Sequence, residues 1–322
     1  MALRTRLTER MELEHPVVLA PMAFAAGGRL AAAVSEAGGL GLIGGGYGNP
    51  EWLDAQFDGA AGAAVGCGFI TWSLEPTVLD DVLRRRPRAI LLSFGDPRRF
   101  APQIQAAGVP LLCQVQTRAD AELALDAGAD VIVAQGAEAG GHGDRRGTFT
   151  LVPELADLIA ARAPETLLCA AGGIADGRGL AAALTLGADG VLVGSRLGAT
   201  KEAEVPEAMH AAALAATGDD TVRTSVMDIA RGLDWPERFT ARVLRNRFTE
   251  DWHGREADLR VSPDAGSAWS AGWSTGDPER ANTFVGEAVG LIGAIEPAGH
   301  VIERMVDEAA TLLRASGDGA PR

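Results

Sequence analysis

One histidine in the sequence stands in a setting that favours chemistry. His142 lies in the segment AQGAEAGGHGDRRG, residues 134–147, among glycines whose backbone can adapt closely to a ligand. An imidazole titrates near neutral pH, so it can act as a general base or donate a hydrogen bond to an anionic group. Glu138 either orients this ring or faces solvent, and the sequence does not separate the two roles. The other histidines lack such surroundings and are predicted to be solvated: His15, His210, His253 and His300.

Two glycine-rich segments are candidates for holding a phosphate. AAGG at residues 170–173 and GSR at residues 194–196 each follow an apolar run. Glycine lets backbone N–H groups come within hydrogen-bonding distance of an anion, and a serine adds a hydroxyl donor. Gly173, Gly194 and Ser195 are therefore the phosphate candidates. Ordinary turn glycines would explain either segment alone, but the two together favour a binding site.

Eight short apolar runs supply the elements that must position these groups. The runs are continuous rather than alternating, as in strands that are covered on both faces. Segments that suit helices lie between them, such as 28–37, 74–85, 118–127 and 177–186. Strand and helix alternate, which predicts a parallel sheet, and eight units favour a closed (β/α)8 TIM barrel over an open doubly wound sheet. The expected strands are 17–20, 40–43, 65–70, 89–93, 110–115, 131–135, 167–171 and 191–194.

A dinucleotide-binding pattern is present but badly placed. GLGLIG at residues 39–44 matches GxGxxG, yet it overlaps the second expected strand instead of following it and opening a helix. A Rossmann site is therefore not favoured.

The chain is predicted to divide into three parts. Residues 1–197 form the cofactor-binding barrel, with a long loop at 136–150 on the face where barrel enzymes keep their chemistry. Residues 198–282 form a smaller, mainly helical appendage on the substrate side, and residues 283–322 return to the barrel as helix. Four tryptophans in the appendage either shape the pocket or form a dimer surface, and aromatic content alone does not choose.

Composition excludes several classes of partner. The 322 residues carry a net charge of −14, which repels nucleic acid and anionic membranes, although a small anion can still bind locally. No apolar run reaches the length of about 18–20 residues needed to span a membrane, and the polar start lacks a secretory signal, so a cytoplasmic location is expected. The three cysteines are far apart and are expected to be buried thiols, with no metal site: Cys67, Cys113 and Cys169.

At these same segments the sequence resembles the nitronate monooxygenase family, formerly called 2-nitropropane dioxygenases, which are FMN-dependent barrel enzymes. The resemblance covers nearly the whole chain, and the long EAGGH element followed by AGGI and GS is highly specific. The motifs that carry it are APMA at 20–23, QGAEAGGHGDRRG at 135–147, AAGGIADG at 170–177, GADGVLVGSRLGATKEA at 187–203, LRNRF at 244–248 with the following Trp252, and VGEAVGLI at 285–292.

The resemblance implies a role for individual residues. Pro21, Met22 and Ala23 would run along the flavin ring, which Gln135, Gly140 and Gly141 would border. The FMN phosphate would be held by Gly172, Gly173, Leu192, Val193, Gly194 and Ser195, while His142 matches the active-site histidine of the family. Two positions depart from many bacterial members, which carry asparagine in place of Gly68 and a basic residue in place of Gln114. Both variants resemble another branch of the family, so the side-chain contacts of Gly68 and Gln114, and with them the substrate, stay open.

The activity implied is the oxidation of alkyl nitronates, and of nitroalkanes, with O2 to a carbonyl compound and nitrite. Two other functions stay open. One is an FMN-dependent reductase of quinones or enoyl thioesters that uses NADH or NADPH, and the other is a flavin- or phosphate-binding module without turnover. The expected partners are small molecules, and a homodimer is left open.

Overall fold

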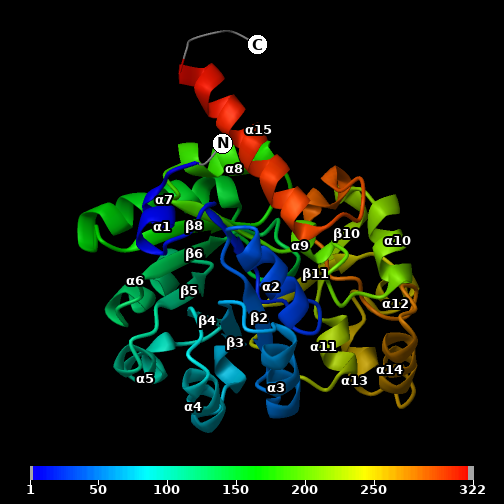
Figure 1. Ribbon diagram of the computed structural model, residues 1–322. Helices are drawn as coiled ribbons and strands as arrows, with labels where there is room; N and C mark the ends of the chain where they lie inside the picture. The colour runs from blue at the N-terminus through cyan, green and yellow to red at the C-terminus, as the bar shows by residue number, and fades with distance from the viewer. Residues whose placement is uncertain (1–2, 318–322) are drawn as a thin grey trace.

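A parallel sheet of eight strands forms the centre of the molecule (Figure 1). The computed structural model describes residues 3–317. The strands pair in the order β1-β9-β8-β6-β5-β4-β3-β2, and every pairing is parallel. Their bounds are β1 Val17–Leu19, β2 Leu42–Gly46, β3 Gly66–Ile70, β4 Ile90–Ser93, β5 Leu111–Val115, β6 Val131–Gln135, β8 Leu167–Ala171 and β9 Gly190–Val193.

The two outer strands of this order meet through one residue. The N–H of Leu19 donates to the carbonyl of Leu40 at 2.9 Å, and the N–H of Leu40 donates to the carbonyl of Val17 at 2.9 Å. Leu40 lies just ahead of β2, so these bonds join β1 to the chain that enters β2. The sheet is thereby closed, and the predicted (β/α)8 barrel is confirmed.

Alternation along the strands separates two apolar layers. In β9, Val191 and Val193 pack outward against the helices, while Leu192 points into the barrel. The interior also holds Leu7 from the short helix α1, Arg6–Arg10, and Met11, which follows that helix directly. The barrel is therefore a packed core, and a binding site must lie at one of its ends.

Helices follow the strands and cover the barrel. Because the chain enters the appendage after β9, the helix that would follow this strand comes only at the C-terminus. That helix, α15 (Ala298–Gly317), packs against α8 and α2 and completes the outer layer. Figure 1 shows it beside α8, with its C-terminal part projecting beyond the barrel. The others are α2 Gly28–Glu36, α3 Pro50–Gly59, α4 Pro76–Arg84, α5 Ala101–Ala106, α6 Arg118–Asp126, α7 Thr148–Arg162 and α8 Gly177–Thr185, with the 3-10 turns η1 Thr71–Ser73 and η2 Pro97–Arg99.

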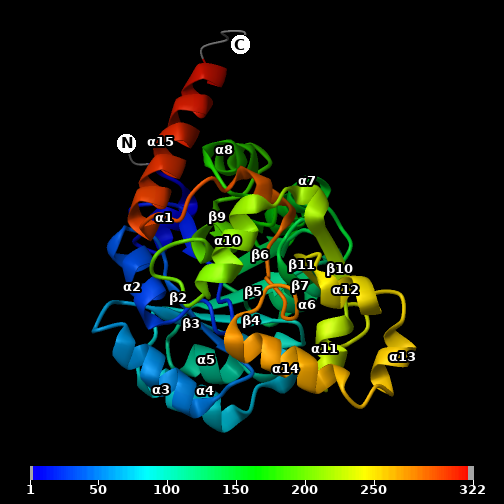
Figure 2. The same ribbon diagram turned by 90° about the vertical axis from the view of Figure 1, so that its right-hand side faces the viewer.

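The appendage lies between β9 and α15 and gathers on one side of the barrel (Figure 2). It is mostly helical, but two of its strands form a second, antiparallel sheet in the order β10-β11-β7. The third strand, β7 (Gly141–Gly143), belongs to the loop predicted at 136–150. The elements here are α9 Ser195–Gly198, α10 Glu207–Ala215, η3 Gly218–Asp220, β10 Thr221–Thr224, α11 Val226–Ala230, β11 Thr240–Leu244, α12 Arg247–Trp252, α13 Glu256–Arg260, α14 Ala265–Thr275 and η4 Glu287–Leu291.

The barrel buries all three cysteines without a disulfide. Burial raises the pKa of each thiol well above its ordinary value, so these cysteines are unreactive core residues. None of the helices in residues 3–317 is both long enough and apolar enough to span a bilayer.

Candidate functional site

A cavity of about 440 Å³ opens where the barrel strands end and the appendage begins. Its size falls in the usual range for small-molecule and cofactor sites. All but one of the residues singled out from the sequence line it: Pro21, Met22, Ala23, Gly68, Gln114, Gln135, Gly140, Gly141, His142, Gly172, Gly173, Leu192, Gly194 and Ser195. The exception is Val193, whose side chain packs outward in the helix layer.

The two glycine-rich strand ends form one wall of this cavity. Gly172 and Gly173 have φ angles of +100° and +76°, a backbone conformation that side chains other than glycine rarely adopt. Within residues 3–317, the N–H groups of Gly173, Gly194 and Ser195 donate to no other group. The Ser195 hydroxyl accepts a hydrogen bond from the N–H of Gly286 at 2.8 Å, which ties this wall to the C-terminal segment. Unpaired backbone donors on a concave surface suit an anionic ligand.

Gly68 is required by its neighbour in the barrel. A methyl group added at this position would lie 2.3 Å from Cγ of Pro21, so only glycine lets β3 approach the segment after β1 this closely. The absence of a side chain at Gly68 therefore shapes the floor of the cavity. Gln114, the other departure from the family pattern, lines the same cavity from β5.

His142 is held in place by its backbone. It pairs with Ala241 in the antiparallel sheet, so the strand β7 that carries it is bound to the appendage. Its carbonyl accepts a hydrogen bond from Nε2 of Gln135 at 2.9 Å, and Oε1 of Gln135 accepts one from Nε2 of Gln116 at 2.8 Å. The histidine is thus fixed between the end of β6 and the second sheet.

Two arginines of the appendage bind the same loop. Arg223 donates to the carbonyl of Gly143 at 3.1 Å, and Arg242 donates to the carbonyl of Ala137 at 3.0 Å. Burial, reinforced by the nearby charge of Arg242, lowers the pKa of Arg223 to about 10. Both guanidinium groups therefore hold carbonyl oxygens of the segment on either side of His142.

A buried carboxylate faces the imidazole. Oδ2 of Asp228 lies 2.8 Å from Nε2 of His142, and the two side chains are 3% and 10% exposed. The other carboxylate oxygen, Oδ1, has no hydrogen-bond partner among the described residues, and Nη1 of Arg231 lies 4.0 Å from it. Asp228 thus contacts His142 on one side and lies near Arg231 on the other, and both of these residues line the cavity.

Aromatic rings enclose the imidazole. The indole of Trp235 stacks on His142 with ring centroids 3.5 Å apart and planes 6° apart, and Phe94 meets the imidazole edge-on at 6.1 Å. Nε1 of Trp235 donates to the hydroxyl of Tyr47 at 3.0 Å. Burial raises the pKa of Tyr47 above its ordinary value. These contacts exclude water from one face of the imidazole.

The structure resolves the open question about Glu138. Its carboxylate accepts hydrogen bonds from the N–H of Thr148 at 3.0 Å and from the Thr148 hydroxyl at 2.8 Å. Glu138 therefore stabilises the start of α7 and does not orient His142.

Two of the histidines predicted to be solvated differ from that prediction. Nδ1 of His15 is buried and has no hydrogen-bond partner among the described residues. His210 lines the cavity, and its Nε2 bonds to the carbonyl of Gly198 at 3.0 Å.

Sequence reasoning missed the residues that surround His142. Asp228 is 86 positions away from it, and no local pattern predicts such a contact. The tryptophans of the appendage were the available signal, since Trp235, Trp269 and Trp273 all line the cavity. Nothing in the sequence marks Asp228, Tyr47 or Arg231.

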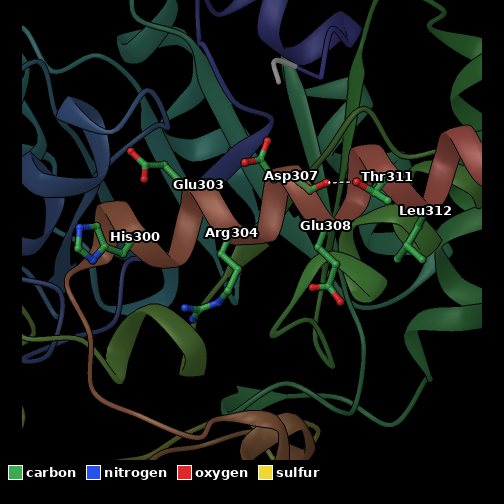
Figure 3. A pocket seen from close by; sticks show the side chains of 7 residues that line it. All are labelled: His300, Glu303, Arg304, Asp307, Glu308, Thr311 and Leu312. Atoms are coloured by element: carbon green, nitrogen blue, oxygen red, sulfur yellow. Dashed lines mark hydrogen bonds between the residues drawn. The ribbon is translucent and has the colours of Figure 1, made fainter.

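A second hollow, of about 560 Å³, runs along α15 (Figure 3). It is lined by His300, Glu303, Arg304, Asp307, Glu308, Thr311 and Leu312. All of these residues belong to one helix, so no second element converges on the hollow. The glycine-lined cavity, where barrel and appendage meet, is the candidate active site.

Comparisons with known proteins identify the family of the chain. The family model described as nitronate monooxygenase matches residues 4–66 and 75–308. The chain is 37% identical to nitronate monooxygenase npaC of Metarhizium robertsii, over 92% of this chain and 91% of that protein. It is 33% identical to nitronate monooxygenase of Neurospora crassa, over 92% and 89%.

Two solved structures superimpose on nearly the whole chain. FabK from Thermotoga maritima superimposes with a TM-score of 0.84 and 31% identity, covering 99% of this chain and 100% of that chain. Nitroalkane oxidase from Streptomyces ansochromogenes superimposes with a TM-score of 0.79 and 25% identity, covering 96% and 99%. With a matching family model and relatives above 30% identity along nearly its whole length, this chain belongs to the nitronate monooxygenase family of enzymes.

Proposed function

We propose that the cavity binds FMN and that the enzyme oxidises alkyl nitronates, and nitroalkanes, with O2 to a carbonyl compound and nitrite. The observation that carries the proposal is a histidine fixed by a buried carboxylate and a stacked indole beside a glycine-lined wall with unpaired N–H donors. The names of the relatives, nitronate monooxygenase and nitroalkane oxidase, support the same class of substrate.

The residues present fit FMN. The N–H groups of Gly173, Gly194 and Ser195 would hold the phosphate, because they have no partner in the described chain. Pro21, Met22 and Ala23 would lie along the flavin ring, and their segment packs against the small residue Gly68. The remaining cofactor contacts in the proposal are Gln114, Gln135, Gly140, Gly141, Gly172, Leu192 and the backbone of Val193.

Bound FMN would supply the capacity to accept electrons from the substrate. The protein supplies a place for the substrate beside His142. The imidazole can donate a hydrogen bond to a nitronate oxygen, or take a proton from a neutral nitroalkane. Trp235 and Phe94 shield the ring from water, which strengthens its electrostatic interaction with an anion. A very acidic protein can therefore still accept an anionic substrate.

A reductase that takes electrons from NADH or NADPH is the second candidate. The barrel also superimposes on the enoyl reductase domain of MlnA from Bacillus amyloliquefaciens with a TM-score of 0.72 at 13% identity, so the fold alone does not separate an oxidase from a reductase. Both candidates use the same cradle and the same histidine. They differ in the compound that delivers electrons to the flavin.

Stopped-flow absorbance of the flavin separates the two. The purified protein is mixed anaerobically with propyl-2-nitronate in one run and with NADH or NADPH in another. Rapid bleaching by the nitronate alone is the expected result. Bleaching by the nicotinamide alone would assign the chain to the reductases, and a protein that takes up no FMN would overturn both functions.

A further inference from the structure

The two nitrogens of the His142 ring have different surroundings. Nε2 lies 2.8 Å from Oδ2 of Asp228. Nδ1 bonds to no residue of the described chain, yet it is not among the buried polar atoms that lack a partner, so it reaches an accessible surface. His142 lines the cavity. Nδ1 is therefore the ring nitrogen that a substrate can reach.

The carboxylate determines which nitrogen carries the proton. The side chain of Asp228 is 3% exposed, and Nη1 of Arg231 lies 4.0 Å from its Oδ1. An ionised carboxylate accepts hydrogen bonds and cannot donate them, so the 2.8 Å contact requires a proton on Nε2. A neutral imidazole with its proton on Nε2 has a lone pair on Nδ1.

The surroundings also prevent the ring from turning. Trp235 stacks on one face at 3.5 Å, and Phe94 packs edge-on. The backbone of His142 is held by Ala241 and by Gln135. Packing thus holds the plane of the ring, and the hydrogen bond to Asp228 determines that Nε2 faces the carboxylate.

We propose that Asp228 is a positioning residue that fixes the tautomer of His142 and makes Nδ1 the proton acceptor for neutral nitroalkanes. In this step the α C–H bond of the nitroalkane breaks and a bond between the proton and Nδ1 forms. The electron pair of the C–H bond becomes the π bond of C=N in the nitronate, and the π pair of the N=O bond moves onto the nitro oxygen, which takes the negative charge. The ring then carries both protons, and Asp228 stabilises its charge. This inference rests on the proposed function.

The direct test is the tautomer of His142, measured by NMR with ¹⁵N-labelled histidine. The sequence has five histidines, and the spectrum of His142→Gln identifies the signals of this one. In the wild-type protein at a pH where the ring is neutral, we expect Nε2 to resonate as an N–H nitrogen and Nδ1 as a nitrogen with a lone pair. The opposite assignment would overturn the proposal.

Asp228→Asn replaces the carboxylate with an amide of the same shape, so it changes only the hydrogen bond to Nε2 of His142. Because Arg231 attracts the amide oxygen, the NH2 group should face Nε2 and force the proton onto Nδ1. We expect the two ¹⁵N signals to exchange character. Turnover of neutral nitroethane should fall about 100-fold or more, the usual contribution of a general base. Turnover of ethyl nitronate, which needs no proton removed, should fall by a much smaller factor.

Asp220→Asn is the matched control, since Asp220 caps η3 in the same appendage and does not contact His142. It should leave the His142 signals and both rates unchanged. Unchanged signals and an unchanged nitroethane rate in Asp228→Asn would overturn the proposal. If Asp228→Asn does not fold, the test of the proposal is the tautomer in the wild-type spectrum together with the two turnover rates of Asp228→Ala. A wild-type protein that oxidises neither substrate would refute the proposed function, while the spectrum would still report the tautomer.

Discussion

The two ends of the candidate active-site cavity are built by different means. The glycine end consists of backbone groups at the ends of β8 and β9, within a barrel whose strands pair side by side. The histidine end is assembled from side chains of distant segments, where Asp228 and Trp235 reach a loop that leaves the barrel at β6. The barrel thus provides a cradle that depends on backbone geometry, and the appendage provides groups that depend on side-chain identity. Substitutions at the histidine end should therefore lower turnover, whereas substitutions at the glycine end should lower stability and cofactor binding.

His142→Ala should have the largest effect on turnover. We expect it to keep FMN, because the phosphate cradle is untouched, and to lose turnover of neutral nitroalkanes by about 100-fold or more. Turnover of preformed nitronates should fall less. Steady-state kinetics on nitroethane and ethyl nitronate, with flavin content from absorbance, test this. Equal losses on both substrates would contradict a base role, and loss of FMN would contradict the separation of the two ends.

Trp235→Leu should have the second-largest effect on turnover. It removes the stacked indole and its hydrogen bond to Tyr47, so the imidazole is free to shift, and a shift of about 1 Å can cost up to about 100-fold in rate. Trp235→Phe keeps a ring on the imidazole and should lose less. Both should bind FMN normally in a flavin titration. Identical rates for the two variants would show that the stack does not position His142.

The strands and the glycine end were predictable because local sequence encodes them. Continuous apolar runs mark strands covered on both faces, and AAGG and GSR mark the turns where backbone donors are exposed. The predicted strands of residues 131–135 and 167–171 coincide with β6 and β8, and the others differ by one to three residues at their ends. GLGLIG at residues 39–44 runs into β2 and does not open a helix after a strand, as a dinucleotide-binding motif would.

The histidine end was only half predictable. The glycine frame singled out His142, but Asp228 and Trp235 reach it through tertiary contacts that no periodicity encodes. The loop at 136–150 hides the strand β7, because three residues gain strand geometry only by pairing with β11. Glu138 was the obvious local partner, and its carboxylate instead accepts from Thr148.

Gly68→Ala tests the cradle end, with an effect on stability rather than on chemistry. The added methyl would lie 2.3 Å from Cγ of Pro21, so the segment along the proposed flavin ring must move. Overpacking of this kind lowers the free energy of unfolding by about 1–3 kcal/mol. We expect a lower melting temperature and weaker FMN binding. The matched control is Gly59→Ala, where a methyl group meets nothing within 4 Å and stability should be equal or slightly higher.

The smallest expected effect is a spectroscopic one at Tyr47, the single tyrosine of the chain. Burial raises its pKa, so the phenol should ionise above the ordinary value of about 10, read at 295 nm as a difference from Tyr47→Phe. Since the pKa is raised by folding, this group stabilises the fold below pH about 10, and the contribution is lost as pH rises further. Arg231→Gln removes a nearby positive charge that lowers the pKa of Tyr47, so it should raise the midpoint of the tyrosine titration further. A midpoint at or below the ordinary value would show that the histidine end is open to water.

The pairing of β7 with β11 has a consequence for how the enzyme would inactivate under mild denaturant. Through this pairing, and through Arg223 and Arg242, His142 depends on the appendage for its position although its loop begins at the barrel. If the appendage opens first as a local unit, the histidine loses its support while the strand ends stay paired in the closed sheet. Activity would then disappear at a lower urea concentration than flavin release, leaving a yellow protein that no longer turns over.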